Sequence, residues 1–217
     1  SLSAAAALFW LWRAVQEAWS PRLRGAWGGV LAVLLASALL FPLLATADKV
    51  TDRMSDAAPR TLDGMAYMPY SVYYENDHEL RLLEDYQAIR WMQENVQGSP
   101  VIVEGHVSEY RWGSRYTIYT GLPGVVGWNW HQRQQRALVP PEWVTQRVDQ
   151  IGQFYTTNDQ QAARDFLNRY GVKYIVVGQM ERALYNEEGI NKFAAWSGTL
   201  WNPVYENGAT TIYEVLP

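Results

Sequence analysis

The longest hydrophobic pattern in the chain is an uncharged run over residues 25–47, GAWGGVLAVLLASALLFPLLATA. As a helix it would extend roughly 34 Å at about 1.5 Å per residue, enough to cross a hydrocarbon core of about 30 Å. A buried helix of a soluble protein is one alternative, but such helices rarely lack charge over this length. Pro42 near the end of the run is compatible with insertion. We therefore predict a transmembrane helix over residues 25–47.

A secretory signal peptide is the second alternative. Ala45-Thr46-Ala47 resembles a cleavage site, but 24 residues precede the run, and a signal peptide has a basic start and a shorter apolar region. Residues 1–12, SLSAAAALFWLW, are typical of the end of a preceding membrane helix. Since the sequence also begins without methionine, we expect it to be part of a longer, multi-pass protein of the cell membrane.

The charges on either side of the run predict its orientation. Residues 13–24, RAVQEAWSPRLR, carry three arginines against one glutamate, whereas three aspartates and only two basic residues follow within residues 48–56. Positive charge favours the cytoplasmic side. Residues 1–24 are thus interpreted as the end of a membrane helix and a cytoplasmic link, and everything after residue 47 is predicted to be extracytoplasmic.

Two units of helix, glycine and strand follow. In the first, Leu82, Tyr86, Ile89, Met92 and Val96 share one face of a predicted helix that begins at the N-cap Asp77 and ends before Gly98. A short buried strand over residues 101–104 comes next. The second unit is a helix over 160–170 with Thr157 or Asn158 as its cap, then Gly171 and a strand over 172–177. This order predicts parallel strands joined by right-handed crossovers.

The end of the chain has a different pattern. Residues 201–205 and 209–216 alternate around Asn207-Gly208, which predicts an antiparallel hairpin that adds to the same sheet. Residues 48–76 have little period and many turn residues, so we expect an irregular linker packed on the domain. The predicted fold class is α/β: a transmembrane helix followed by one small α/β domain, residues 77–217, with parallel strands and a C-terminal antiparallel hairpin.

Composition narrows the function. Eleven tryptophans and 14 tyrosines are many for 217 residues, and such side chains gather at membrane interfaces and in carbohydrate sites. The net charge of −4 without a dense basic cluster argues against nucleic acid as a partner. The chain has no cysteine, and its three histidines lack metal-ligand spacing, so no metal site is predicted. No nucleophile elbow, phosphate loop or dinucleotide fingerprint occurs either.

One segment, residues 114–136, SRYTIYTGLPGVVGWNWHQRQQR, shows neither a helical nor an alternating period. One interpretation is that its glycines and Pro123 permit a tight backbone path that serves only to pack tryptophans on the sheet. Alternatively, the segment lines a cleft, where arginines bind pyrophosphate or carboxylate and tryptophan faces a sugar ring or prenyl chain. We expect Arg115 and His131 to face a ligand and Trp128 to be partly a packing residue. The ligand-binding candidates in this segment are Arg115, Trp128, His131, Arg133 and Arg136.

Three carboxylates complete the list of candidates. Asp63 is either an ordinary turn residue before Gly64 or a group near a cleft of the membrane part. Glu104 and Glu109 follow the first strand, where open α/β sheets bind ligands, and are either acid–base groups or a solvated rim. If Arg115 is buried instead, its nearest expected partners are Glu104, Glu109 and Glu181. No catalytic residue can be named.

An ordered series of short motifs resembles the uncharacterised "YYY" membrane-protein family of Chloroflexi and Archaea. The resemblance covers nearly everything from Asp48 onward. The motifs are TLDGMAY at 61–67, DYQAIRW at 85–91, Ser114-Arg115, TGLP at 120–123, Gly127-Trp128, His131, Tyr155-Thr156, RYGVKYIVVG at 169–178, Glu181-Arg182, Tyr185, Lys192-Phe193 and Ile212-Tyr213.

Members of that family are similar to polytopic GT-C-type glycosyltransferases. The resemblance implies a polyprenyl-phosphate sugar donor used at the outer membrane face and a catalytic carboxylate in an exterior loop outside this sequence. No cofactor is implied within residues 1–217, and a divalent cation in the absent membrane part is left open. The enzyme hypothesis makes this domain a shaper of the substrate site. The alternative is a non-catalytic module that binds an envelope glycan or protein and is anchored by the membrane helices.

The topology prediction can be tested with reporters. Alkaline phosphatase fused after Pro217 should be active, because the arginines before the apolar run hold the link in the cytoplasm. A fluorescent reporter that matures only in the cytoplasm should stay dark at the same position. The reverse pair of results would contradict the orientation.

Overall fold

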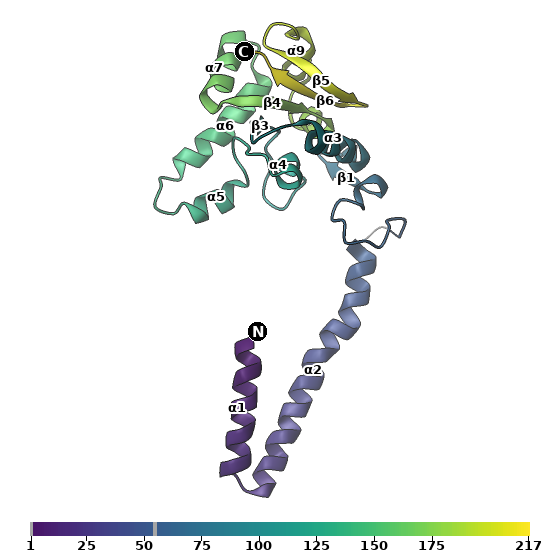
Figure 1. Cartoon of the computed structure of the whole chain (residues 1–217), viewed down its shortest axis with the longest axis vertical. Coiled ribbons are helices and arrows are strands. Elements are labelled where there is room, and N and C mark those ends of the chain that lie inside the picture. Colours follow the sequence, from purple (N-terminus) through teal and green to yellow (C-terminus); the bar gives the residue numbers. More distant parts are fainter. Residues whose placement is uncertain (1, 54–55) are drawn as a thin grey trace. The chain divides into compact units, whose positions relative to one another are not determined.

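The computed structural model describes residues 2–53 and 56–217 (Figure 1). The chain divides into two compact units, Ser1–Asp56 and Ala57–Pro217. Residue 1 of the predicted first segment and residues 54 and 55 of the predicted linker lie outside the described residues.

The first unit consists of helices α1 (Leu2–Ala18) and α2 (Pro21–Arg53). Most of the link predicted over residues 13–24 is therefore helical, and the chain turns at residues 19 and 20. Pro21 suits the first position of a helix, because its missing N–H would be unpaired there. Helix α2 extends beyond the predicted 25–47 at both ends, since Asp48 and the residues after it do not interrupt a helix.

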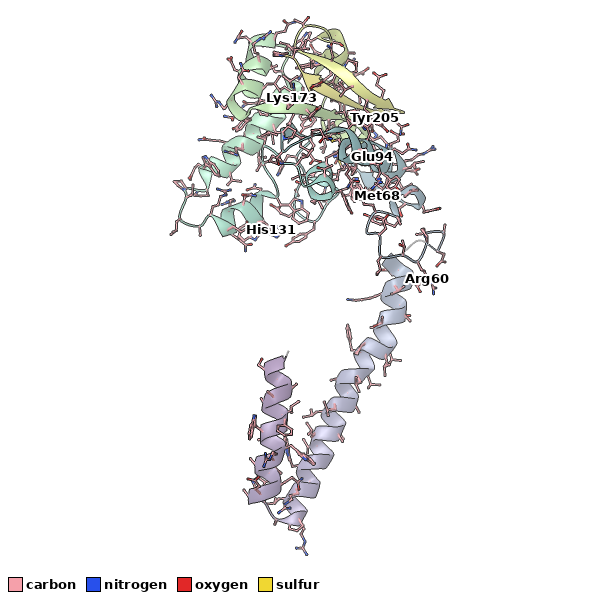
Figure 2. The ribbon with its side chains drawn as sticks, in the orientation of Figure 1. Arg60, Met68, Glu94, His131, Lys173 and Tyr205 are labelled. Carbon is pink, nitrogen blue, oxygen red and sulfur yellow. The ribbon has the colours of Figure 1, made fainter. Side chains whose placement is uncertain are left out.

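Among the described residues, one helix is long and apolar enough to cross a membrane. This helix, Pro21–Asp52, contains an 18-residue window with a mean hydropathy of 2.4, and none of that window is buried inside the protein. The large side chains of this helix stand out from the ribbon (Figure 2). Length and composition thus fit a membrane anchor. The multi-pass topology and the ends at residues 25 and 47 stay predictions.

The second unit is a mixed α/β domain, and the predicted fold class is confirmed. Within the described residues its main sheet has four strands in the order β3-β4-β6-β5. Strands β3 and β4 are parallel, as predicted, and the C-terminal hairpin adds to β4 in antiparallel pairing. The strands of this sheet are β3 (Val101–Val103), β4 (Val172–Val177), β5 (Trp201–Asn207) and β6 (Thr210–Val215).

Helices cover both faces of the sheet. Side chains alternate between the two faces along each strand, so one strand contributes to the cores on both sides. Ile175 and Val177 of β4 pack under α6 (Glu142–Thr156), α7 (Gln160–Tyr170) and α9 (Glu187–Ala195). Val176 belongs to the opposite core, under α3 (Leu82–Asn95) and α4 (Arg115–Thr120). Figure 1 shows α6 and α7 on one side of the sheet and α3 on the other. Two short helices, α5 (Asn129–Gln135) and α8 (Gln179–Leu184), lie in the connections.

The structure corrects the start of the first predicted helix. Residues 78–81 form a strand, β2 (His78–Arg81), which pairs with β1 (Val72–Glu75), so α3 begins only at Leu82. Asn76 and Asp77 both have positive φ, the geometry of a tight hairpin turn, so Asp77 is no N-cap. The predicted irregular linker 48–76 also contains the end of α2, a 3₁₀ turn (Met68–Tyr70) and β1.

The segment 114–136 is likewise more regular than predicted. It holds α4 and α5, and Tyr116 of α4 lies in the core with α3. Each of these helices is only one to two turns long, too short for a hydrophobic period to appear in the sequence.

The N-cap of α7 is Asp159, not Thr157 or Asn158. Its carboxylate accepts hydrogen bonds from the N–H groups of Gln161 and Ala162. Asp159→Ala should therefore lower the free energy of unfolding by about 1 kcal/mol. Urea unfolding of the full chain in detergent, followed by near-UV circular dichroism, measures this loss. Asn158→Ala is the control, because it removes only an exposed contact to Glu188. Equal losses in both variants would contradict the assignment.

Candidate functional site

A glycine lies just beyond each of the parallel strands, Gly105 after β3 and Gly178 after β4, and one carboxylate joins the two. The backbone N–H of Gly105 donates to Oε1 of Glu181, and that of Gly178 donates to Oε2, both at 2.8 Å. A Cβ at Gly105 would lie 3.0 Å from Glu181 Oε1, and one at Gly178 would lie 3.3 Å from Oε2. Glycine at both positions therefore lets the carboxylate approach the backbone closely.

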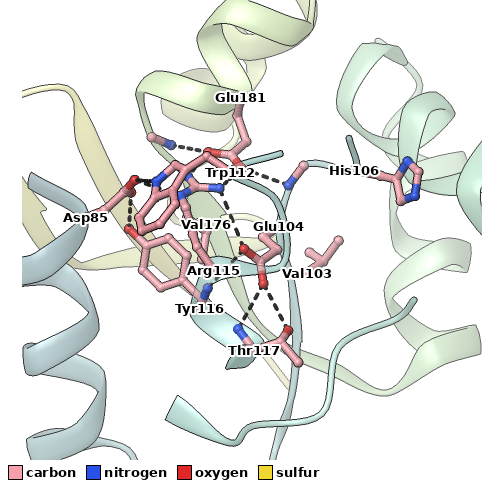
Figure 3. A network of polar contacts seen from close by, with 12 residues as sticks. Asp85, Val103, Glu104, His106, Trp112, Arg115, Tyr116, Thr117, Val176 and Glu181 are labelled. Atoms are coloured by element: carbon pink, nitrogen blue, oxygen red, sulfur yellow. Dashed lines mark hydrogen bonds and ion pairs between the residues drawn. The ribbon is translucent and has the colours of Figure 1, made fainter. Parts of the chain in front are cut away.

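Arg115, at the start of α4, binds this carboxylate through both terminal nitrogens, at 3.0 and 3.3 Å (Figure 3). Its Nε donates to Asp85 on α3 at 2.9 Å, and Glu104 lies 3.6 Å from Nη1. The side chain of Arg115 is only 1% exposed. One arginine thus links helices α3, α4 and α8 with the end of strand β3.

The remaining oxygen positions of these carboxylates are also filled. Asp85 accepts hydrogen bonds from the indole N–H of Trp112 at 2.7 Å and from the hydroxyl of Tyr116 at 3.1 Å. Glu104 accepts from the N–H groups of Tyr116 and Thr117 and from the hydroxyl of Thr117. Figure 3 shows these contacts converging from both sides of Arg115. Buried ions tolerate loss of water only when paired and hydrogen-bonded in this way.

Glu181 and Glu104 lie at different distances from the guanidinium of Arg115, so its positive charge lowers their pKa values to different extents. Burial by itself would raise the pKa of Glu181, but the charge and hydrogen bonds of Arg115 and two backbone N–H groups lower it below its usual range. Burial raises the pKa of Glu104, and the more distant Arg115 offsets this only in part. By linkage, Glu181 stabilises the fold above its unfolded pKa and loses this contribution as pH falls. Glu104 contributes in the opposite sense, with stability lost as pH rises through its folded pKa.

These contacts correct two predictions from the sequence. Arg115 does not face solvent or an open cleft, because its guanidinium is enclosed by carboxylates. Glu104 is buried and so belongs to no solvated rim. The expectation that a buried Arg115 would pair with Glu104 and Glu181 is confirmed, whereas Glu109 is not among its partners.

Glu109 instead belongs to a second group of residues, at the surface. Its carboxylate accepts a hydrogen bond from the N–H of Trp130 at the start of α5, and this bond lowers the pKa of Glu109. Beside it, the rings of Tyr110, Trp128 and His131 pack against one another with centroids 5.2–5.9 Å apart. We call these three residues the aromatic cluster.

The aromatic cluster is presented to solvent. Tyr110 is 80% exposed, and its backbone has φ of 65°, a costly conformation for a bulky residue. Its hydroxyl lies 3.3 Å from Nε2 of His131. Among the described residues, the buried indole N–H of Trp128 has no hydrogen-bond acceptor. The cluster thus combines the exposed ring of Tyr110 with the half-buried rings of Trp128 and His131 and a hydroxyl–imidazole pair.

The other candidates lie apart from both groups. Asp63 is exposed and accepts a hydrogen bond from the N–H of Met65, as a turn residue does. Arg133 and Arg136 are exposed on or just after α5, and their guanidinium groups lie over the rings of Trp130 and Trp143. A ligand-binding role for Asp63, Trp128, His131, Arg133, Arg136 and Glu109 stays a prediction.

Sequence reasoning missed two residues that matter. Asp85 accepts a hydrogen bond from Nε of Arg115. The sequence contains a signal that Asp85 is buried, because it shares the helix face of Leu82, Ile89 and Met92. An aspartate at such a position requires a buried partner. Tyr110 was missed because an exposed tyrosine outside a periodic segment gives no signal.

Comparisons with known proteins give matches among solved structures. Neither a protein-family model nor a curated protein sequence matches the chain, so membership of the "YYY" family stays a prediction. Among solved structures, the chain matches the C-terminal globular domain of an oligosaccharyltransferase from Archaeoglobus fulgidus. The match has a TM-score of 0.39 and 18% identity, and it covers 60% of this chain and 95% of that one. Residues of the chain itself, rather than this match, carry the proposals below.

Metal ions have no evident place in the part of the chain that the structure describes. Within residues 2–53 and 56–217, no group of three or more histidine, aspartate or glutamate side chains is arranged to hold one.

Arg115→Ala should destabilise the second unit strongly. The change leaves Asp85 and Glu181 as uncompensated buried charges, and breaking such a pair costs about 3–5 kcal/mol. Thermal and urea unfolding of the full chain measure the loss. Arg133→Ala is the matched control: an exposed arginine of the same segment, whose loss should change stability by no more than about 0.5 kcal/mol. A variant as stable as the control would show that Arg115 is not structural.

Proposed function

We propose that this chain is the membrane-anchored, extracytoplasmic part of a GT-C-type glycosyltransferase, in which the aromatic cluster binds the sugar of a polyprenyl-phosphate donor or its glycan acceptor. The observation that carries the proposal is the packing of the exposed Tyr110 against the half-buried rings of Trp128 and His131. Two of these residues, Trp128 and His131, belong to the motifs that resemble the "YYY" family.

The chemistry of the cluster suits a sugar. A pyranose ring has an apolar face of C–H groups and a rim of hydroxyls. Aromatic rings match the face, and a tyrosine hydroxyl or histidine nitrogen matches the rim.

The membrane part of the proposal has separate support. Helix α2 is long and apolar enough to anchor the chain in a bilayer. A lipid-linked donor would then be held in the same membrane as the domain, which raises its local concentration at the cluster. The catalytic carboxylate is expected outside residues 1–217, so the second unit would shape the substrate site rather than perform the chemistry.

One observation favours the alternative of a glycan-binding module without catalysis. Tyr110 is exposed on an open surface, whereas sugar sites of enzymes are usually concave. Both versions need the aromatic cluster to bind sugar, and they differ in whether the protein turns a donor over.

Sugar binding is tested with variants of the cluster. In the full-length protein that contains this chain, Tyr110→Ala and His131→Ala should each weaken glycan binding about tenfold, equivalent to about 1.4 kcal/mol. Binding is measured in detergent on a glycan array and then by titration with the best glycan. Tyr74→Ala is the control, because Tyr74 is also an exposed tyrosine, 63% accessible, but lies on β1. Cluster variants that bind as well as this control would remove the basis of the proposal.

Turnover separates the two versions. Incubation of the purified full-length protein with a radiolabelled polyprenyl-phosphate sugar should release sugar from the lipid, and Tyr110→Ala should slow that release. Glycan binding without turnover would support the binding module. Turnover that survives deletion of residues 77–217 would show that this domain does not shape the site.

A further inference from the structure

We propose that the second unit docks on an anionic lipid surface through a patch beside the aromatic cluster. The patch comprises α5 and the connection from α5 to α6, and we call it the lipid-facing patch. Its members are Trp130, Arg133, Arg136, Leu138, Val139 and Trp143. The inference goes beyond the proposed sugar site, and it rests only on α2 lying in a bilayer.

The apolar members of the patch are unusually exposed. Leu138 is 101% exposed and Trp130 is 51% exposed, and Val139 and Trp143 are also classed as exposed. All four apolar side chains lie within one stretch of 14 residues, 130–143, and none of the four is buried. Contiguous exposed apolar side chains of this kind mark an interaction surface. Figure 1 shows α5 and the following connection at a corner of the unit, away from α9 and β5, and Figure 2 marks the corner by His131.

Arginines are paired with the tryptophans of the patch. The guanidinium of Arg133 lies 6.0 Å from the ring centre of Trp130, and that of Arg136 lies 5.1 Å from Trp143. Arg147 of α6 lies on the same indole at 4.1 Å. Tryptophan is enriched at the level of lipid headgroups, and arginine there binds phosphate with its forked donors. Each tryptophan–arginine pair therefore offers an indole that suits the headgroup level and a guanidinium that suits a lipid phosphate.

The charge of the patch is opposite to that of the chain. The whole protein has a net charge of −4, whereas the stretch 130–143 holds Arg133 and Arg136 against the single carboxylate of Glu142. Arg147 beside it adds a third positive charge and the nearby Glu109 a second negative one, so the patch and its surroundings stay net positive. Each basic residue close to an anionic membrane contributes about 1 kcal/mol to binding. An anionic headgroup is thus the partner that the charges favour.

The chain also keeps the second unit close to a bilayer that holds α2. Helix α2 ends at Arg53 and the second unit begins at Ala57, so three residues join them, and these could span at most about 11 Å. Such a short tether converts docking into an intramolecular event at high effective concentration. A patch of four apolar side chains and two arginines, with Arg147 beside it, is then sufficient, although it would bind weakly if the domain were free.

The experiment uses single cysteines, which can be placed freely because the natural chain has none. Leu138→Cys in the full chain is labelled with an environment-sensitive fluorophore and reconstituted, one chain per disc, in nanodiscs of phosphatidylcholine with or without phosphatidylglycerol. Lipids with a nitroxide on the acyl chain report contact by quenching. Asn168→Cys on the exposed side of α7 is the matched control within the same unit. Leu39→Cys on α2 tests the anchor separately.

The expected result is blue-shifted, quenched emission from the label at position 138 in phosphatidylglycerol discs, and unquenched emission at position 168. Arg133→Gln and Arg136→Gln should each lower the ratio of docked to free domain about fivefold, and added salt should act in the same direction. An unquenched label at 138, or equal quenching at 138 and 168, would overturn the inference. So would a blue shift at 138 without lipid quenching, which would indicate contact with protein instead. An unquenched label at 39 would show that anchoring by α2 is wrong. Sugar binding by the aromatic cluster is measured independently, so either proposal can fail alone.

Discussion

The second unit depends on one carboxylate, that of Glu181, which is held by two backbone N–H groups and one guanidinium. The N–H groups belong to the glycines at the ends of β3 and β4, so the carboxylate fixes how these parallel strands finish. Because Gly178 is also the N-cap of α8, its bond to Glu181 at the same time caps the start of that helix. Arg115 then extends the same contact to α3 through Asp85. Desolvating four charged groups is costly, and the arrangement is stable only because each charge is paired or hydrogen-bonded.

This network decides where a ligand can bind. Open α/β sheets usually bind ligands beyond the carboxyl ends of their strands. Here that position is filled by the protein's own charges, and the side chains of Arg115 and Glu181 are almost completely buried. The exposed side chains that could bind a ligand therefore lie farther along the chain after β3, in the aromatic cluster. Tyr110 and Ser114 both adopt positive φ on this path, which turns the backbone between the network and the aromatic cluster.

Much of the fold could be predicted from the sequence, and the misses have physical causes. The glycines after α3 and α7 and the apolar runs that follow them predicted two parallel strands, because these signals are local. Asp77 failed as a cap because an aspartate before a helical pattern and an aspartate in a hairpin turn give the same signal. Helix α6, which is absent from the predicted elements, has Val144, Ile151 and Tyr155 on one buried side, a period that the sequence contains. The ionic network could not be read fully, since its members lie up to 96 residues apart (Asp85 to Glu181) and only the fold brings them together.

The two proposed surfaces meet on a single short helix. Successive residues of an α-helix are rotated by about 100°, so His131 and Arg133, two positions apart on α5, lie on nearly opposite sides of it. His131 packs with Trp128, whereas Arg133 lies over Trp130. One side of α5 thus presents the aromatic cluster with its hydroxyl and imidazole groups. The other side presents the indole of Trp130 with the guanidinium of Arg133. A lipid-linked sugar has the same two parts, a hydroxyl-rich ring and a phosphate at the membrane surface. A helix with these two sides at a headgroup layer would orient such a molecule by both of its ends.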